Sequence, residues 1–230
     1  MRYLSALLPA VVACLSACTS APELPAGRGH DTPEVDFSGA WEVDYSKSET
    51  VHDSYEALMR ELRRQMERRE AMNQGGGGTS TGVLIAAGGE DIYALARLTE
   101  IVTDIQLMEI DQAAREITIK REGSFALYCE FGGDELYTQR NSMGSEVCGW
   151  DGHQLVFQIF LPEGVRILHR FTLGPDGERI NVATTVRSDQ VAYPFTLDRV
   201  FNRYDPSSSG IRCRQTLTRG RVCTTEAPAL

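Results

Sequence analysis

Several motifs by which common enzymes are recognised are missing from this chain of 230 residues. It contains no Ser-x-x-Lys and no His-Glu-x-x-His arrangement, so it lacks the signatures of β-lactamase-type acylases and of zinc peptidases. A paired-carboxylate site is missing too, because Asp151, Asp176 and Asp189 lie in expected turns, where such a side chain caps its own backbone. We therefore predict a protein that is not an enzyme and holds no cofactor.

Positive charge is scarce. The chain has 23 basic and 32 acidic residues, a net charge of −9, and only Lys47 and Lys120 are lysines. Nucleic acid and anionic lipid headgroups repel such a chain, so we exclude both as natural partners. Arginine suits phosphate and carboxylate ligands, but a GC-rich genome produces the same bias, and we favour that explanation.

A membrane-spanning segment is also missing, because no apolar run reaches the roughly 20 residues that a spanning helix needs. The run from Tyr3 to Ala13 follows one positive residue, Arg2, and is typical of a signal peptide. It leads into Leu15-Ser16-Ala17-Cys18, and Val11-Val12-Ala13-Cys14 fits the same pattern with a shorter apolar core.

The stretch from Leu15 to Cys18 resembles the lipobox of bacterial lipoproteins, in which the leader is removed and the cysteine becomes the lipidated first residue. The resemblance implies a signal peptide at residues 1–17 and a lipid anchor, palmitate included, on Cys18. Thr19 rather than Asp follows the cysteine, which in such lipoproteins implies transport to the outer membrane. Residues 18–36, the lipidated cysteine followed by a stretch with several prolines and glycines, then tether a domain that faces the periplasm.

Alternation of apolar and polar residues, typical of half-buried strands, begins near Phe37 and resumes at Ile105. Turn residues such as Asp151-Gly152 and Gly174-Pro175-Asp176-Gly177 separate the later runs and are strong hairpin signals. Strands joined by short turns form an antiparallel meander, and closure into a barrel hides its edges. We expect a mainly β domain at residues 37–204, an up-and-down barrel of about 8–10 strands.

A helical insertion after the first strand, about residues 50–103, interrupts this pattern. Apolar residues fall at helical spacing within residues 51–72, namely Tyr55, Leu58, Met59, Leu62 and Met66. Glycines at 75–78 end this helix, and a second short helix is expected from Glu90 to about Val102. We favour a helix packed permanently on the barrel over a movable lid or a docking surface, because packing supplies most of a helix's stability.

The order of these elements resembles a family of lipocalin-like envelope proteins of Gram-negative bacteria, whose functions are mostly unassigned. The family's motifs are matched by Phe37 to Ser48, Trp150 to Leu155, Leu173 to Gly177 and Arg199 to Phe201. The resemblance implies a lipocalin-like barrel, and true lipocalins pair a tryptophan of the first strand with an arginine of the last. Trp41 and Arg199 match these residues, and we assign them this structural closure.

Four cysteines remain after the anchor, and an even number in an exported chain indicates disulfides. Of the three possible pairings we expect the one between neighbours in sequence, Cys129 with Cys148 and Cys213 with Cys223. A regular strand between Cys129 and Cys148 would hold them roughly 9–10 Å apart, too far to bridge. This pairing therefore predicts that residues 132–145 leave the sheet.

One histidine, His169, shares the apolar face of its predicted strand with Ile167 and Phe171. If that face points inward, the imidazole would bind the polar end of a ligand, and Phe157, Phe171 and Phe195 would contact the apolar part. The favoured alternative is a core histidine with a hydrogen-bond partner.

Two further hypotheses receive less weight. Cys129, Cys148, His153 and His169 have zinc-ligand chemistry but not the close spacing of structural sites, and an oxidising compartment favours a disulfide, so we expect no metal. Residues 75–82 resemble a phosphate loop, but no lysine follows Gly82, and we interpret them as a linker.

Two functional predictions follow. The first is a non-enzymatic binding module that holds an apolar or amphipathic envelope molecule, since a barrel of about eight strands can enclose one small ligand. The alternative is a structural or assembly protein of the envelope, with a solid barrel, that contacts proteins through its helical insertion or an Arg-rich loop. That loop lies in the tail at residues 205–230, from Cys213 to Cys223, and contains Arg214, Arg219 and Arg221.

Overall fold

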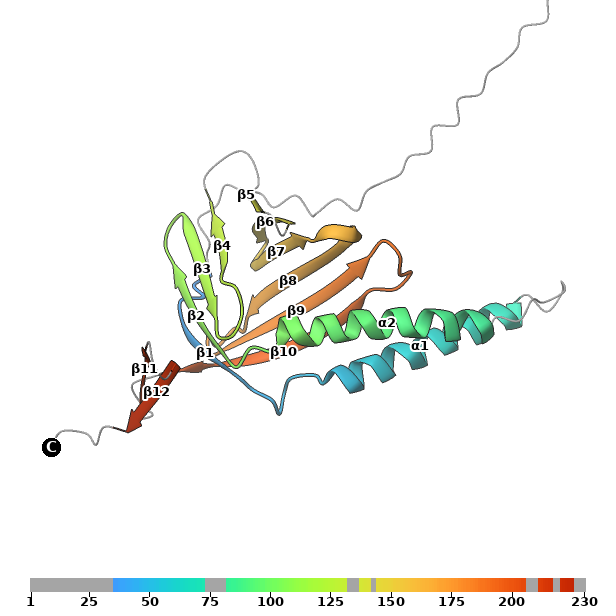
Figure 1. Cartoon of the computed structure of the whole chain (residues 1–230), viewed down its shortest axis with the longest axis horizontal. Helices are drawn as coiled ribbons and strands as arrows, with labels where there is room; N and C mark the ends of the chain where they lie inside the picture. Colours follow the sequence, from blue (N-terminus) through green and yellow to red (C-terminus); the bar gives the residue numbers. More distant parts are fainter. Residues whose placement is uncertain are drawn as a thin grey trace, which may run out of the picture.

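The computed structural model describes residues 35–72, 82–131, 137–141, 144–205, 211–216 and 220–225 (Figure 1). Two long helices, α1 (Val51–Met72) and α2 (Gly82–Thr103), follow strand β1 (Gly39–Val43). The other strands are β2 (Leu107–Gln112), β3 (Glu116–Arg121), β4 (Leu127–Glu130), β5 (Tyr137–Asn141), β6 (Gly144–Asp151), β7 (Gln154–Phe160), β8 (Val165–Leu173), β9 (Arg179–Ser188), β10 (Phe195–Tyr204), β11 (Ile211–Thr216) and β12 (Gly220–Thr225). The stretch around Cys18 lies outside the described residues.

Ten strands form one antiparallel sheet in the order β4-β3-β2-β1-β10-β9-β8-β7-β6-β5. Apart from β4 and β5, each strand pairs with its successor, and β1 pairs with β10 so that Trp41 lies opposite Arg203. The predicted antiparallel meander, its lipocalin-like barrel form and the helical insertion after the first strand are therefore confirmed, and the barrel is nearly closed. The described strands form no ladder between β4 and β5, which leaves one gap in the barrel.

Two hairpins show the turns that the sequence signals predict. Between β6 and β7, Asp151 pairs with Gln154, and Gly152 adopts a φ of 61°. Between β8 and β9, Gly177 adopts a φ of 71°. A positive φ strains residues that carry a Cβ atom, so glycine at these two positions favours the tight turn.

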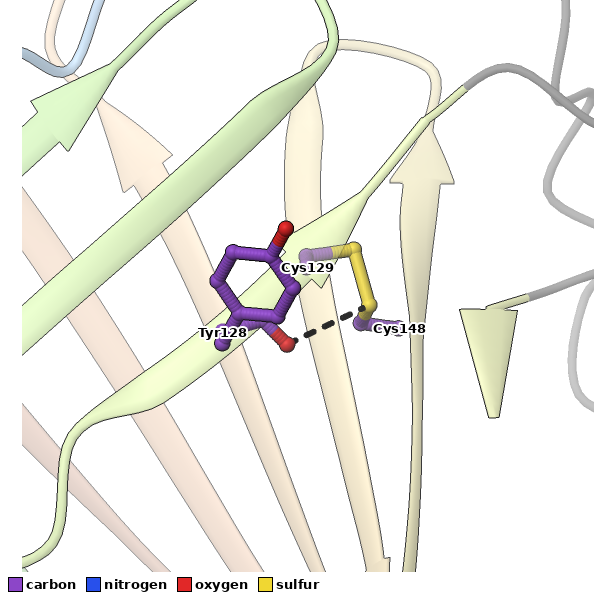
Figure 2. The surroundings of a disulfide bond; sticks show 3 residues. All are labelled: Tyr128, Cys129 and Cys148. Atoms are coloured by element: carbon purple, nitrogen blue, oxygen red, sulfur yellow. Dashed lines mark hydrogen bonds between the residues drawn. A yellow bond between two sulfur atoms is a disulfide. The ribbon is translucent and has the colours of Figure 1, made fainter. Parts of the chain in front are cut away.

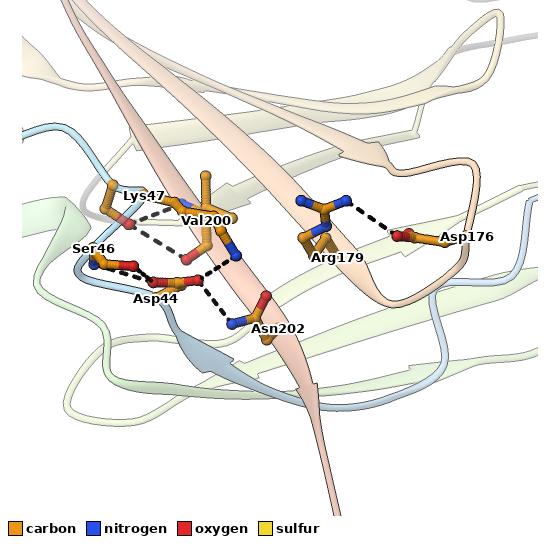
Figure 3. Close-up of polar contacts among 8 residues, drawn as sticks. Asp44, Ser46, Lys47, Asp176, Arg179, Val200 and Asn202 are labelled. Carbon is orange, nitrogen blue, oxygen red and sulfur yellow. Dashed lines mark hydrogen bonds and ion pairs between the residues drawn. The ribbon is translucent and has the colours of Figure 1, made fainter.

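Hydrogen bonds attach the connection between β1 and α1 to β10 (Figure 3). The Asp44 carboxylate accepts from the Ser46 hydroxyl at 2.6 Å and from the Asn202 side-chain amide at 2.9 Å, and it pairs with Lys47 at 2.9 Å. These donors, Ser46 above all, hold the pKa of Asp44 below its ordinary value. The chain that leads into the helices is therefore anchored on the last strand of the barrel.

Helix α1 has a capping residue, and helix α2 begins earlier than predicted. Thr50 caps α1, because its hydroxyl oxygen accepts from the Asp53 backbone N–H at 3.1 Å. Helix α2 begins at Gly82, so the predicted start at Glu90 is wrong. Gly88 and Gly89, just before Glu90, do not interrupt the helix, since one interior glycine costs only about 1 kcal/mol. No helix in the described part of the chain is long and apolar enough to cross a membrane.

Two apolar clusters fill the interior. The first, here the strand cluster, is built by the strands and the segments beside them: Phe37, Trp41, Val43, Ile105, Met108, Ile110, Ile117, Ile119, Leu127, Cys129, Cys148, Trp150, Leu155, Phe157, Phe171, Ile180, Val182 and Phe201. The second, here the helix cluster, joins both helices to β8, β9 and β10: Met59, Leu62, Ile92, Leu95, Ala96, Ile167, Val186, Phe195 and Leu197. The helices lie side by side along β10 and cover the inner face of these strands (Figure 1).

Trp41 closes the barrel with a different arginine from the one predicted. The Arg203 guanidinium lies over the buried Trp41 ring, 4.4 Å from its centroid, and donates to the Ser38 and Gly177 carbonyl oxygens. Arg203 is the register partner of Trp41, whereas Arg199 is four residues further into β10 and so cannot reach the ring in the same way. The assignment of Arg199 to closure is therefore wrong, and Arg199 is available for another role.

Candidate functional site

A layer of polar side chains separates the two apolar clusters on three neighbouring strands. His169 of β8, Thr184 of β9 and Arg199 of β10 share the face that carries both clusters, because alternate residues of a strand lie on one face. Each has a helix-cluster residue on one side and a strand-cluster residue on the other: Ile167 and Phe171 for His169, Val186 and Val182 for Thr184, Leu197 and Phe201 for Arg199.

Two further charged residues belong to this layer. Arg121 ends β3 on the inward face of Ile119, and Glu146 of β6 lies on the inward face of Cys148. The inward side of the barrel therefore carries two arginines and one glutamate, each of them partly buried, and the Arg121 guanidinium donates to the Phe125 carbonyl oxygen at 2.7 and 2.9 Å.

A small cavity of about 20 Å³ lies at the polar layer. Arg121, His169, Thr184 and Arg199 line it together with the strand cluster, and Val102 and Thr103 of α2 line it from the helical side. This volume holds about one water molecule. The helices thus complete the wall of the cavity, and the cavity itself is too small for a larger ligand in this conformation.

His169 is neutral and has a partner. Its side chain is 3% exposed, and its Nδ1 atom lies 2.9 Å from the Thr184 hydroxyl oxygen. Burial lowers the pKa of His169 to about 3, and the positive charge of Arg121 adds to the shift. The favoured interpretation, a core histidine with a hydrogen bond, describes this geometry, and the same imidazole also lines the cavity.

Arg121 and Glu146 influence each other in the interior. Burial lowers the pKa of Arg121 to about 10, while the Glu146 charge acts in the opposite direction. Burial raises the pKa of Glu146, while Arg121 and a hydrogen bond from the Tyr128 backbone N–H lower it. The Glu146 Oε1 atom is buried with no hydrogen-bond partner in the described part of the chain.

Arg199 is the cation of the layer with an unused donor. Its Nε atom is buried and has no hydrogen-bond partner among the described residues. An unsatisfied buried donor costs about 1–3 kcal/mol, and a guanidinium does not lose its proton to avoid this cost. An acceptor in the cavity, above all an anionic one, would remove the penalty.

The structure brings two of the four residues predicted to bind a ligand to the cavity. His169 and Phe171 line it. Phe157 lies in the strand cluster with its ring centroid 5.9 Å from that of Phe171, and Phe195 lies in the helix cluster. Sequence reasoning missed Arg121 and Glu146. The available signal was a charged residue at an inward position of a strand, and Arg199, assigned to closure by resemblance alone, carries the same signal.

A disulfide crosses the gap in the barrel (Figure 2). Cys129 of β4 and Cys148 of β6 are bonded, with their Cα atoms 5.8 Å apart, as the sequence predicts. The prediction that residues 132–145 leave the sheet is wrong, because β5 pairs with β6. Strand β5 starts opposite Cys148 and runs toward Gly144, so it does not lie between the two cysteines.

The other predicted sites have different outcomes. The register of β11 and β12 places Cys213 opposite Cys223, and a bond between them stays a prediction. The zinc hypothesis fails for the bonded pair Cys129 and Cys148, and the described residues contain no group of three His, Cys, Asp or Glu side chains that could hold a metal ion.

Residues 78–82 read Gly-Thr-Ser-Thr-Gly, a match to the Gly-x-Ser-x-Gly nucleophile motif of hydrolases. That motif acts at a sharp turn from a strand into a helix. Here the preceding described element is α1, which ends at Met72, and residues 73–81, with most of the predicted linker, lie outside the described residues. The serine of this match, Ser80, is therefore outside the described residues.

Comparisons with known proteins gave the following results. No protein-family model matches the chain, and no curated protein matches it in sequence. Similar solved structures include the fluorescent protein UnaG (TM-score 0.39, 15% identity, 73% of this chain and 97% of that one) and a secretory abundant heat soluble protein from Ramazzottius varieornatus (0.39, 12%, 76% and 100%). Another is the REP1-NXSQ fatty acid transporter (0.38, 11%, 74% and 97%). Likenesses of this degree carry no inference about ligands.

Proposed function

We propose that this protein is a non-enzymatic binding module whose barrel holds an amphipathic molecule with an anionic head. The buried and unpartnered Nε atom of Arg199, beside the cavity, is the observation that supports this proposal most directly. A carboxylate, sulfonate or phosphate oxygen placed there accepts the orphaned N–H in a charge-assisted hydrogen bond.

The charges of the polar layer select the head group. Arg121 and Arg199 outweigh Glu146 by one positive charge, and His169 is neutral because its pKa is about 3. Charges interact more strongly in a buried layer than in water. The layer therefore favours an anionic head over a neutral or cationic one.

The apolar part of the ligand needs space that the helices now occupy. A cavity of about 20 Å³ holds one water molecule, whereas pockets for small ligands measure about 300–1,000 Å³. The helix cluster is joined to the barrel by side-chain packing and by two chain connections, not by strand ladders. Moving α1 and α2 away exposes the apolar residues Ile167, Val186 and Leu197 next to the polar layer.

The location of the protein is a further part of this proposal. The lipobox-like stretch at Leu15 to Cys18 supports a lipid anchor on the outer membrane, with the domain in the periplasm. The disulfide between Cys129 and Cys148 fits an oxidising compartment. A Cys18→Ala variant should lose the acyl mass and fractionate with soluble periplasmic proteins. Unchanged membrane fractionation would contradict the anchor.

Calorimetric titration of the domain with decane-1-sulfonate and with 1-decanol tests the binding proposal. We expect tighter binding of the sulfonate, and an Arg199→Met variant should weaken it about tenfold or more, because a hydrogen bond to a charged group is lost. The matched control is Arg187→Met, which removes an exposed arginine from the outer face of β9. Equal effects of the two variants would contradict a role for the lumen.

The small volume of this cavity favours a second functional candidate, a structural or assembly protein of the envelope. Its barrel would be a solid scaffold, and its helical insertion or Arg-rich C-terminal segment would contact another protein. Absence of binding of both decyl compounds to the wild type would favour this candidate.

A further inference from the structure

The C-terminal segment concentrates positive charge in an acidic protein. No acidic residue lies between Asp205 and Glu226, and this stretch contains four arginines, Arg212, Arg214, Arg219 and Arg221. The other 19 of the 23 basic residues share the rest of the chain with all 32 acidic ones. The net charge of −9 therefore hides a segment of opposite sign, and the exclusion of anionic surfaces drawn from that net charge does not apply to it.

This segment forms a hairpin outside the barrel, here the Arg-rich hairpin. Strands β11 and β12 make a two-stranded sheet of their own, in which Cys213 lies opposite Cys223. Arg212 and Arg214 are two positions apart on β11 and so belong to the same face of the hairpin. A two-stranded hairpin alone is only marginally stable in water, so the predicted bond between Cys213 and Cys223 would fix this register.

The segment that precedes β1 is attached at the end of the barrel where β10 finishes. Tyr204, the last residue of β10, pairs with Ala40 of β1. Just before β1, the Gln112 side-chain amide donates to the Val35 carbonyl oxygen at 2.8 Å and accepts from the Phe37 backbone N–H at 2.9 Å. The predicted tether therefore leaves the barrel at the end where the chain leaves β10 for the Arg-rich hairpin.

The Arg-rich hairpin cannot lie far from this end. Only residues 206–210 separate Asp205 from the first residue of β11, and a chain of this length spans at most about 20 Å. Figure 1 shows β11 and β12 beyond the end of β10. The most basic segment of the protein and the root of the tether are thus neighbours.

We propose that the Arg-rich hairpin docks on the anionic phosphates of the membrane that holds the tether. This inference rests on the lipid anchor proposed above and goes beyond the ligand site in the barrel. An anchor on Cys18 keeps that membrane within about 60 Å of Val35, the fully extended length of the chain between them. Each arginine near an anionic membrane surface strengthens association about fivefold.

The acidic barrel does not cancel this attraction. At physiological ionic strength charges are screened beyond about 8 Å, so barrel carboxylates farther than this from the membrane contribute little. The anchor also raises the local concentration of the hairpin at the surface, so a weak contact is sufficient. Without the anchor the same contact is easily removed by salt, which agrees with the soluble fractionation expected of Cys18→Ala.

Flotation with lipid vesicles tests the hairpin without the anchor. The protein is the chain of residues 19–230, which contains every described residue. One set of vesicles combines phosphatidylethanolamine with anionic phosphatidylglycerol, and the other combines it with neutral phosphatidylcholine. We expect flotation with the anionic vesicles alone, and its loss at about 0.5 M salt, because screening then shortens the reach of each charge by about half.

Two variants of equal charge show which arginines act. The double variant Arg212→Gln, Arg214→Gln should bind the anionic vesicles about tenfold or more weakly. Arg68→Gln, Arg69→Gln removes the same charge from exposed positions of α1 and should bind like the wild type. Equal binding to both kinds of vesicle, no binding to either, or equal weakening in both variants would overturn this inference. Absence of the acyl mass on Cys18 in the full chain would instead overturn the proposed anchor and leave the vesicle result standing.

Discussion

The two ends of the barrel are closed by different means. At one end the strand cluster consists of inward side chains of the barrel strands and the segments beside them, with a disulfide among them. At the other end α1 and α2 supply five of the nine buried residues of the helix cluster, and they add no strand to the sheet. Loss of the first end requires the strands to separate, whereas loss of the second requires only that packed helices move. The comparison places stability at one end and access at the other.

Trp41→Ala is expected to have the largest effect and tests whether the strand cluster is the stable end. Trp41 is fully buried, and its ring carries the stacked Arg203. Truncation leaves a large cavity, and we expect the free energy of unfolding in urea to fall by about 3–5 kcal/mol. Tyr45→Ala, which removes an exposed aromatic side chain from the same segment, should change it by less than about 0.5 kcal/mol. Equal stability of the two variants would mean that the strand cluster is not the stable end.

The disulfide provides a second test of whether the strand cluster is the stable end. Cys129 and Cys148 are separated by 19 positions, and a closed loop of this size stabilises a protein by about 3 kcal/mol through the unfolded chain. A double variant with alanine at both positions should lose about this amount in urea. Dithiothreitol should destabilise the wild type by more than the double variant, in which the remaining effect reports on Cys213 and Cys223. A double variant as stable as the wild type would show that the contact between β4 and β6 needs no covalent bond.

Leu62→Ala tests the helical end. Leu62 is 6% exposed and packs within the helix cluster. We expect a loss of about 2–3 kcal/mol, together with faster hydrogen exchange in α1 and α2 and unchanged protection in β1 and β10. Arg63→Ala, at an exposed position next to it, is the control. Equal loss of protection in the strands would mean that the two helices and the barrel open as one unit.

The layer between the two ends should make stability depend on pH. Burial lowers the pKa of His169 in the folded protein to about 3, below the 6.5 of the unfolded chain. The unfolded state therefore binds more protons between these values, and stability falls as pH falls through this window, by up to about 2 kcal/mol from pH 7 to pH 5. His169→Gln should lose this part of the pH dependence in urea unfolding, whereas His153→Gln, in an exposed turn, should retain it. If the free energy of unfolding of His169→Gln depends on pH as that of the wild type does, another group causes this dependence.

The parts of the fold that depend on neighbours in sequence were predictable. Alternation from Phe37 and Ile105, the helical spacing of Met59 and Leu62, and the turn at Asp151-Gly152 are each encoded within a few residues. Alternation and turn chemistry act locally, so they yield the meander, its hairpins and the helical insertion. The pairing of Cys129 with Cys148 was also predictable. The course of the chain between them was not, because the start of β5 opposite Cys148 depends on strand register.

The candidate site was only partly predictable for the same reason. His169 stands out because it interrupts an apolar face, and Arg199 does so as well, but the partner of Trp41 is Arg203. Which arginine stacks on the ring depends on the register between β1 and β10, which no local pattern determines. Arg121 and Glu146 come from strands that are not neighbours in the sheet, and only the curvature of the barrel places both on its inward side.

The sequence by itself determined an acidic chain with a lipobox-like start, a β meander and a helical insertion, because composition, periodicity and turn residues express themselves without distant partners. The tertiary structure decided that the helices cover the inner face of β8–β10, that a disulfide joins β4 to β6, and that two arginines, a glutamate and a histidine from four strands lie on the inward side of the barrel. These features depend on register and closure, which are set by the packing of the whole barrel and bring together residues far apart in the chain.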